Sequence, residues 1–290
     1  MTSVPVKSTS VIRDANERVI ADYYDRKRDS VINTPPKFAD LYHHHLGIGE
    51  FDRTVLDAPE DVRESRIMAE IHRMETDQVS LILDAMGEVP ADSRVMDAGS
   101  GRGGTSFLIH ERFGCSVVGV SLSQYQVDFA NRQAVERGCA DKVRFDHRNM
   151  CATDFPDQSF DFIVANETDM YVDLVETYRE FARLLAPGGR LVFVTWCCND
   201  AIDPYCAEAK AIDRNYPGSR TDPRSLFFSA LAEAGLVPSR VADITTAPVP
   251  YLELRMQAAG RTGVEKPYYD GFVANTINYL VVAADRVVRT

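Results

Sequence analysis

Apolar positions in the first third of the chain recur at the spacing of an α-helix. Residues 14–30 place apolar and aromatic side chains every three or four positions among charges, which predicts an amphipathic helix. Residues 61–86 repeat this pattern over a longer span, and Pro35-Pro36 interrupt the chain between the two segments. We therefore expect an N-terminal helical cap over residues 14–90, preceded by a disordered N-terminus over residues 1–13.

From about residue 91 onward, short apolar runs alternate with helical segments. The predicted strands cover residues 94–99, 116–123, 143–150, 160–167, 190–197 and 277–287. Helices are expected between the first three of them, over residues 104–114 and 124–137. This alternation predicts an α/β domain over residues 91–290 with a doubly wound, mostly parallel sheet, closed at its edge by the last strand. The proline-rich segment around residues 200–265 is less regular and is predicted to be an inserted substrate cap.

Charge and cysteine usage exclude several classes of protein. A net charge of −11 argues against a nucleic-acid partner, because such a protein needs a basic face to neutralise phosphates. No apolar run has membrane-spanning length, and the first residues do not resemble a signal peptide, so no membrane partner is expected. The six cysteines lack paired spacing, which favours reduced thiols, a cytoplasmic location and no zinc site.

A glycine-rich stretch, "VMDAGSGRGG" (95–104), lies between a predicted strand and a predicted helix. Gly99 and Gly101 would allow backbone amides to approach a nucleotide at the helix N-terminus. A dinucleotide site also requires an acid at the end of the second strand, but residues 120–123 read Val-Ser-Leu-Ser. Asp97 could instead orient the cationic amino-acid part of S-adenosylmethionine; the alternative is that it only caps the following loop.

Four stretches in order, "DAGSGRGG", "GVSLSQYQ", "FDFIVANE" and "LLAPGGRLVFVT", resemble the class I S-adenosylmethionine-dependent methyltransferases over residues 92–198. The sequence Ser-Leu-Ser-Gln at residues 121–124 resembles that of the methyltransferases that methylate carbon. The resemblance implies a Rossmann-like fold with S-adenosylmethionine as cofactor. The residues expected to contact this cofactor are Tyr24, Asp97, Gly99, Gly101, Ser121, Ser123, Gln124, Asn149, Met150 and Asn166.

Methylation of an alkene leaves a carbocation, which the site must stabilise and then deprotonate. Aromatic faces suit the first task, at about 0.5–2 kcal/mol each, and a positioned carboxylate suits the second, at about 10²–10⁴ in rate. Glu167 follows the fourth predicted strand, at the sheet edge where ligands bind. Tyr171 shares a face with it if that segment is helical. The alternative for Glu167 is a carboxylate favoured by a helix dipole.

The stretches "LYHHHLGIGEFDR", "IHRMETDQ", "ANETDMYVDL", "PYLELR" and "YLVVAADRV" together resemble the geranyl diphosphate 2-C-methyltransferase family, from about residue 20 to residue 287. This resemblance implies a small isoprenoid substrate, a C-methylated prenyl diphosphate as product, and a cation quenched at the Glu167 position. It also implies Mg²⁺ accompanying the diphosphate. No Asp-rich DDxxD motif is present, so no protein-held metal cluster is expected.

Substrate contacts are expected from Tyr42, Arg53, Trp196, Tyr216, Tyr251 and Arg255, with Lys266 as a further candidate. The arginines suit a diphosphate because they form charge-assisted hydrogen bonds, although Arg53 could equally be a solvated surface charge. The segment "AIDRNYPGSRTD" around Tyr216 departs from the geranyl enzymes. The length of the prenyl chain therefore stays open between isopentenyl, geranyl and farnesyl diphosphate, or a finished neutral terpenoid.

Three consecutive histidines, His43, His44 and His45, raise the question of a metal site. In an extended chain alternate side chains point opposite ways, so at most His43 and His45 could act together, and catalytic zinc usually needs a third protein ligand. We predict that the segment forms part of a pocket wall, with His45 orienting Glu167 or contacting the diphosphate. Plain packing and metal ligation are the alternatives.

Two further functions remain open. One is a methyltransferase for a neutral terpenoid or another small metabolite, in which the arginines would be dispensable. The other is a methyltransferase-like fold retained as a cofactor-binding or scaffolding subunit. The N-terminal amphipathic helix could also pack against a second copy, so a homo-oligomer is possible.

Overall fold

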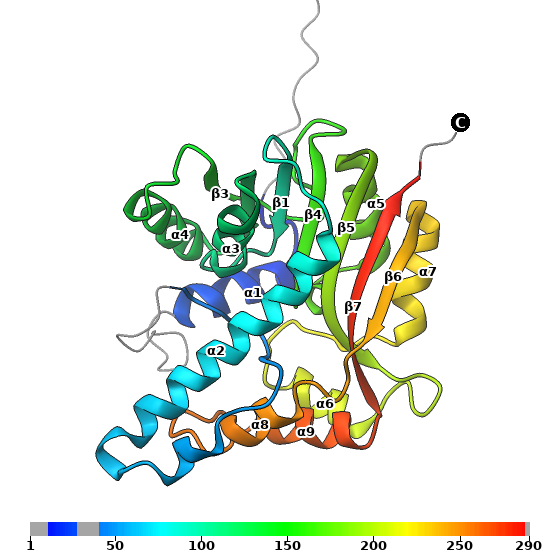
Figure 1. Ribbon diagram of the computed structural model, residues 1–290. Coiled ribbons are helices and arrows are strands. Elements are labelled where there is room, and N and C mark those ends of the chain that lie inside the picture. The colour runs from blue at the N-terminus through cyan, green and yellow to red at the C-terminus, as the bar shows by residue number, and fades with distance from the viewer. Residues whose placement is uncertain (1–10, 28–40, 288–290) are drawn as a thin grey trace, which may run out of the picture.

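The computed structural model describes residues 11–27 and 41–287 of the chain and forms a seven-stranded sheet with helices on both faces (Figure 1). The strand order is β3-β2-β1-β4-β5-β7-β6. The strands are β1 (Arg94–Ala98), β2 (Ser116–Ser121), β3 (Val143–His147), β4 (Phe160–Asn166), β5 (Leu185–Cys198), β6 (Leu236–Asp243) and β7 (Ile277–Arg286). Strands β1 to β5 are parallel, and β7 runs antiparallel to both of its neighbours.

The helices are α1 (Ala15–Arg26), α2 (Glu60–Met86), α3 (Gly104–Phe113), α4 (Gln124–Glu136), α5 (Leu174–Leu184), α6 (Ala207–Asp213), α7 (Arg224–Ala234), α8 (Val249–Arg255) and α9 (Glu265–Val273). Two short 3-10 helices are η2 (Arg53–Asp57) and η3 (Asp169–Tyr171). Among the described residues, no helix is both long enough and apolar enough to cross a bilayer.

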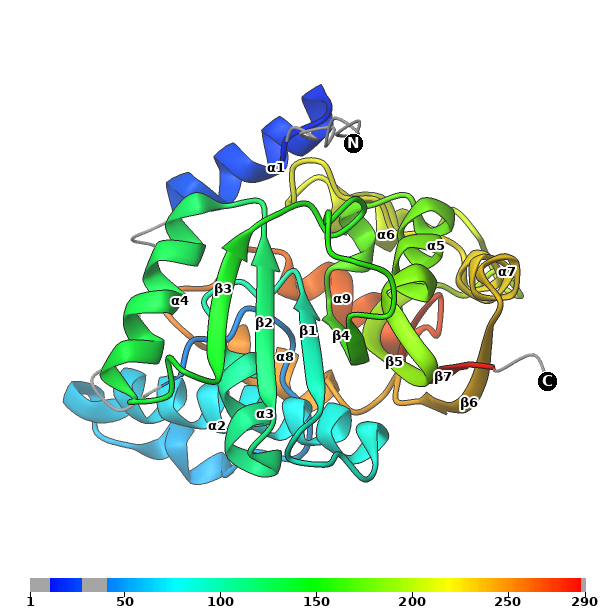
Figure 2. The ribbon, with the colours of Figure 1, turned by 90° about the horizontal axis from the view of Figure 1, so that it is seen from above.

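Successive residues of a strand point to opposite sides of the sheet. Helices cover both faces, so side chains on both sides of the central strands are buried. In β1, Val95 packs into a core shared with α2, α3 and α4, whereas Met96 packs into a second core shared with α5 and α7. These two layers of helices lie on opposite faces of the sheet (Figures 1 and 2). The predicted α/β class, with its mostly parallel sheet, is confirmed.

The order of the last strands differs from the prediction. The segment 277–287 was expected to close the sheet edge, but β7 lies between β5 and β6, and β6 is the edge strand. The sequence does not predict β6, because its residues are largely exposed and do not form an apolar run. The strand also includes Pro238, where the pairing is irregular. The segment 200–265, predicted as a cap, thus contributes β6 and α7 to the sheet layers. The exact cap boundaries stay predictions. Of the N-terminus predicted to be disordered over residues 1–13, residues 1–10 lie outside the described residues, as does the Pro35-Pro36 break. Val11 and Arg13 are described and form hydrogen bonds with Asn149 and Glu17, respectively.

Helix α1 lies across the ends toward which β2 and β3 point (Figure 2). Its first turn is capped by Asp14, whose side chain accepts a hydrogen bond from the Glu17 amide. Near its other end, the Asp25 carboxylate accepts hydrogen bonds from the Ser123 hydroxyl (2.6 Å) and the Tyr125 amide (3.3 Å) at the start of α4. Asp25 therefore holds α1 over the carboxyl edge of the sheet.

We predict that Asp25→Ala loosens α1 without unfolding the sheet. A hydrogen bond to a charged group contributes about 1.5–3 kcal/mol, so amide hydrogen exchange in α1 should become about 10- to 100-fold faster. Exchange in β4 and β5 should stay unchanged. Asp22→Ala, on the exposed side of the same helix, is the matched control. Equal exchange rates in α1 for the two variants would contradict the docking role of Asp25.

Candidate active site

The glycine loop joins β1 to α3 and holds a buried carboxylate. Asp97, near the end of β1, is 1% exposed and accepts a hydrogen bond of 2.5 Å from the Ser106 hydroxyl. Burial raises the pKa of Asp97 to about 6, although the hydrogen bonds from Ser106 act in the opposite direction. Gly99 has a φ of 77°, and a Cβ there would lie 2.3 Å from Cγ2 of Thr168, so only glycine fits this turn.

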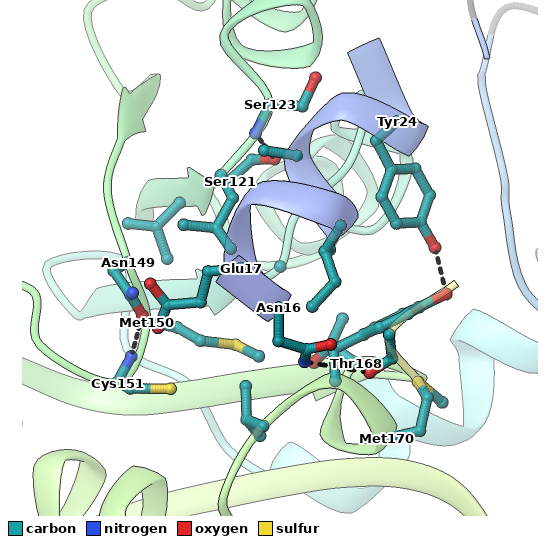
Figure 3. A pocket seen from close by; sticks show the side chains of 18 of the residues that line it. Asn16, Glu17, Tyr24, Ser121, Ser123, Asn149, Met150, Cys151, Thr168 and Met170 are labelled. Carbon is teal, nitrogen blue, oxygen red and sulfur yellow. Dashed lines mark hydrogen bonds between the residues drawn. The ribbon is translucent and has the colours of Figure 1, made fainter. Parts of the chain in front are cut away.

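A cavity of about 270 Å³ opens above the carboxyl ends of β1, β2, β3 and β4, under α1; we call it the large cavity. It is the place where open α/β sheets bind ligands. Figure 3 shows how side chains from α1, from the ends of β2 and β3 and from the segment after β4 surround this cavity. The predicted cofactor residues that line it are Tyr24, Gly99, Gly101, Ser121, Ser123, Asn149, Met150 and Asn166.

A smaller cavity of about 60 Å³ adjoins the glycine loop and contains Asp97 together with Gly99 and Gly101. Tyr42 lines this smaller cavity, where its ring contacts Phe129 and Arg102. Gly104 brings the Tyr42 segment against α3, since a Cβ at Gly104 would lie 2.4 Å from the Tyr42 carbonyl oxygen. Tyr42 therefore lies on the glycine-loop side of the site rather than among the expected substrate contacts.

The end of β2 shows one difference from the expected contacts. Gln124, the first residue of α4, is exposed and donates to Asp128 at 2.8 Å on the helix surface, and it does not line the cavity. Two positions further along the helix, Gln126 turns inward. Its Oε1 accepts a hydrogen bond of 2.9 Å from the Ser121 hydroxyl. Gln126, and not the predicted Gln124, therefore lines the large cavity.

Glu167 lies at the junction of the large cavity and a second, aromatic pocket. It directly follows β4 with a φ of 53°, a left-handed conformation uncommon for a non-glycine residue. Its Oε1 accepts hydrogen bonds from the Leu46 amide (2.9 Å) and the Tyr279 hydroxyl (2.5 Å). Burial raises the pKa of Glu167 to about 7, while these two hydrogen bonds lower it. Such a carboxyl group can exchange a proton near neutral pH.

The aromatic pocket, of about 80 Å³, is lined by tyrosines, a tryptophan and histidines. Its aromatic and imidazole residues are Tyr24, His43, His44, His45, Tyr171, Trp196, Tyr216, Tyr251 and Tyr268. The hydroxyl groups of Tyr24 and Tyr171 hydrogen-bond each other at 2.8 Å and thereby connect α1 with η3. A shared face for Tyr171 and Glu167 required a helical segment, but Glu167 is left-handed and only Asp169–Tyr171 form η3. Both side chains nevertheless line this pocket.

Cationic side chains lie at one end of the aromatic pocket. Arg255, 5% exposed, donates from Nη2 to Glu265 at 3.1 Å, while its Nη1 is buried without a hydrogen-bond partner among the described residues. Lys27 lines the same pocket, and its Nζ lies 3.0 Å from Nε2 of His44. Burial lowers the pKa of Lys27 to about 8, and Arg255 adds to this effect. A buried guanidinium with an unused donor is a binding site for an anion.

A second carboxyl group lies beside these cations. Glu75 of α2 accepts a hydrogen bond of 2.8 Å from the Tyr251 hydroxyl. Burial raises the pKa of Glu75 to about 8, and the hydrogen bond from Tyr251 opposes this shift. Even with Arg255 nearby, which lowers the pKa, the protonated form is therefore favoured at neutral pH.

The structure places Arg53 away from the site. Its side chain is 66% exposed in η2 and pairs with Glu253 at 3.4 Å, and it lines none of the three cavities. Lys266 is similarly exposed and pairs with Asp270. Both are solvated surface charges. The prediction that Arg53 contacts the substrate is therefore corrected. Sequence analysis could not distinguish it from Arg255, because exposure depends on the packing of α8 and α9.

The histidine triplet alternates as expected for an extended chain. His43 and His45 hydrogen-bond each other (3.2 Å), whereas His44 faces Lys27 on the other side. Burial lowers the pKa of His43 to about 2 and that of His45 to about 4, so both are neutral. Within residues 11–27 and 41–287, no group of three or more metal-binding side chains is assembled. His45 makes no hydrogen bond to Glu167; the next backbone amide, that of Leu46, does.

Several residues of the site were missed by sequence analysis. They are Lys27, Glu75, Gln126, Tyr268 and Tyr279. For Glu75 a signal existed, because it lies four residues after Ile71 and four before Val79, on the apolar side of α2. A carboxyl group on the apolar face of a helix is uncommon, because its burial is unfavourable, and it therefore indicates a functional site. Tyr279 carried no such signal, since aromatic residues are common in buried strands.

Comparison with known proteins places the chain among methyltransferases. Residues 96–193 match a family model described as a methyltransferase domain. Geranyl diphosphate 2-C-methyltransferase of Saccharopolyspora erythraea is 45% identical over 268 residues, covering 92% of this chain and 94% of that protein. The enzyme of the same name from Streptomyces lasalocidi is 39% identical, covering 85% and 82%.

A solved structure extends this similarity to the whole fold. It is geranyl diphosphate C-methyltransferase from Streptomyces coelicolor A3(2), in complex with Mg²⁺, geranyl diphosphate and S-adenosyl-L-homocysteine. It superposes with a TM-score of 0.88 at 36% identity and covers 94% of this chain and 99% of that one. The glycine loop, the buried glutamate after β4 and these similarities lead to one conclusion: the chain belongs to the geranyl diphosphate 2-C-methyltransferase family.

Proposed function

We propose that this protein transfers a methyl group from S-adenosylmethionine to carbon 2 of geranyl diphosphate, with Glu167 as the base. The observation that carries the proposal is the position of Glu167 between the large cavity and the aromatic pocket. A base at this junction can reach a carbon atom that has just received a methyl group from the other side. The family relation supports the substrate and the methyl donor.

The large cavity and the smaller cavity beside it together fit the methyl donor in their chemistry. Asp97 and the backbone of Gly99 and Gly101 would hold the amino-acid part, whose ammonium group matches a buried carboxylate. Ser121, Gln126 and the segment around Met150 would enclose the adenosine part. When bound, S-adenosylmethionine supplies an electrophilic methyl group.

The cationic end of the aromatic pocket fits the diphosphate, taken as its Mg²⁺ complex. The unused Nη1 donor of Arg255 and the ammonium group of Lys27 would bind phosphate oxygens. Glu75, beside Arg255, would lose its proton more easily near the metal cation. The neutral terpenoid alternative is less well supported, because it would leave the buried Nη1 of Arg255 without a partner.

The reaction balances as one bond formed, one bond broken and one proton moved. The π electrons between carbons 2 and 3 of the geranyl chain form the new bond to the methyl carbon as its bond to sulfur breaks. Positive charge develops at carbon 3, where faces of Trp196, Tyr216 and Tyr268 could stabilise it by about 0.5–2 kcal/mol each. Glu167 then accepts the proton from carbon 2, and the double bond re-forms.

Other features of the protein stay predictions. The alternative of a scaffolding subunit is less well supported, because the large cavity and the aromatic pocket meet at Glu167, whose pKa is about 7. The cytoplasmic location, the lack of nucleic-acid and membrane partners and the possible homo-oligomer await direct measurement.

We predict that Glu167→Gln lowers turnover by at least about 10²-fold while the protein still binds the methyl donor, because the amide cannot accept the proton. Turnover is measured with methyl-labelled S-adenosylmethionine, Mg²⁺ and geranyl diphosphate, and donor affinity by calorimetry. The products are identified by mass spectrometry, with geraniol as the uncharged comparison substrate. A near-normal rate would remove Glu167 from the role of base.

The pH profile provides an independent test. A base acts in its deprotonated form, so kcat/KM should rise with pH through about 7; it should fall again above about 8, where Lys27 loses the charge that binds phosphate. The Tyr279 hydroxyl favours the carboxylate of Glu167, so its removal in Tyr279→Phe should shift the rising limb to higher pH. Tyr178→Phe removes a buried hydroxyl that bonds Asp169 instead and should leave the limb in place. Identical profiles for the wild type and Tyr279→Phe would contradict the assignment.

Arg255→Ala should weaken geranyl diphosphate binding by about 10- to 100-fold, since a charge-assisted hydrogen bond is lost, and should weaken geraniol binding far less. Dissociation constants are measured with Mg²⁺ and S-adenosylhomocysteine present. Arg53→Ala, an exposed arginine outside the cavities, is the matched control and should behave like the wild type. Equal losses for the diphosphate and the alcohol would argue against a phosphate contact.

A further inference from the structure

The end of β2 lacks the acidic residue that commonly grips the ribose of a bound nucleotide. Its positions are occupied by Ser121 and Ser123, whose hydroxyl groups donate to Gln126 and Asp25 respectively. Asn149, at the end of β3, is also engaged. Its Nδ2 donates to the Val11 carbonyl (3.2 Å), and its Oδ1 accepts from the Cys151 amide (2.9 Å). The adenosine end of the cavity thus needs another strong acceptor.

Five carboxylates line the large cavity, and four of them are helix caps, exposed, or already assigned to the reaction. Asp14 caps α1, Asp173 caps α5, and Glu176 is exposed beside Arg13. The fourth is the proposed base at the junction with the aromatic pocket. Glu17 is the remaining one: it is 7% exposed and belongs to α1.

Glu17 faces the cavity from above. Figure 3 shows its carboxylate beside Asn149 and Met150, on the same side of the cavity as Ser121. Arg13 donates to the carboxylate from its amide (2.5 Å) and Nε (2.9 Å), and its Nη2 forms an ion pair with Oε1 at 2.8 Å. A carboxylate has about four acceptor sites, so these three contacts leave one for a ligand.

We propose that Glu17, supplied by the N-terminal helix, replaces the missing β2 acid and accepts hydrogen bonds from the adenosine part of the methyl donor; this rests on the proposed function. The groups of adenosine that can donate are the 6-amino group and the two ribose hydroxyls. Asn149 and Met150, which the sequence predicts to contact the methyl donor, lie in this region of the cavity.

The contact also links the two cavities. Helix α1 carries Glu17 to the large cavity; about two turns later it brings Tyr24, and about three turns later its C-cap Lys27, to the aromatic pocket. A donor bound through Glu17 would hold α1 in place and complete the wall of the pocket. Donor binding should therefore protect α1 from hydrogen exchange.

The test uses the full chain and three ligands in calorimetry. They are S-adenosylhomocysteine, S-inosylhomocysteine, which lacks the 6-amino group, and the S-adenosylhomocysteine analogue without ribose hydroxyls. Glu17→Gln should weaken S-adenosylhomocysteine binding by about 10- to 100-fold, as expected for a lost charge-assisted contact. The loss should disappear for the one analogue that lacks the contacted group. Asp22→Asn, on the exposed side of α1, should bind all three ligands as the wild type does.

Amide hydrogen exchange gives a second readout. S-adenosylhomocysteine should slow exchange in α1 of the wild type and have a smaller effect in Glu17→Gln. Equal losses of affinity for all three ligands, or none, would overturn the role of Glu17 while leaving the methyltransferase assignment intact. A wild-type protein that does not bind S-adenosylhomocysteine at all would instead overturn the proposed function and, with it, this inference.

Discussion

The carboxyl group of Glu167 connects three segments that lie far apart in the sequence. It follows β4, accepts a hydrogen bond from the Leu46 amide after the histidine triplet, and accepts another from Tyr279 of β7. Burial of a carboxylate is unfavourable, and a left-handed backbone adds roughly 1–3 kcal/mol of strain. The surrounding cores stabilise this arrangement. The same burial keeps the pKa of Glu167 near neutrality, where a proton can be accepted.

The N-terminal helix has a comparable role for the two cavities. It is tied to α4 through Asp25 and to η3 through the Tyr24–Tyr171 hydrogen bond. It covers the large cavity and also forms part of the aromatic pocket. Exclusion of water matters for a carbocation, because a water molecule could add to the cation before the base removes its proton. One short helix thus lines both sides of the proposed reaction.

The histidine triplet illustrates how local sequence and tertiary structure share the outcome. Alternation of the side chains follows from an extended backbone and was predictable. The link to Glu167 was not, because the backbone amide of Leu46 forms it instead of an imidazole. Backbone amides carry no residue identity, so no sequence pattern marks them.

The sequence by itself determined strands β1 to β5, the helices α3 and α4 between the first three of them, the glycine turn and the position of Glu167 after β4. These features depend on local periodicity and on backbone conformations that only glycine adopts readily. Only the tertiary structure decided that β7 lies inside the sheet, that Gln126 faces the cavity, and that Arg255 is buried while Arg53 is exposed. The physical reason is that convergence of distant side chains depends on how helices pack across the sheet, and hydrophobic burial, the main force in that packing, is non-directional and leaves no short-range signature.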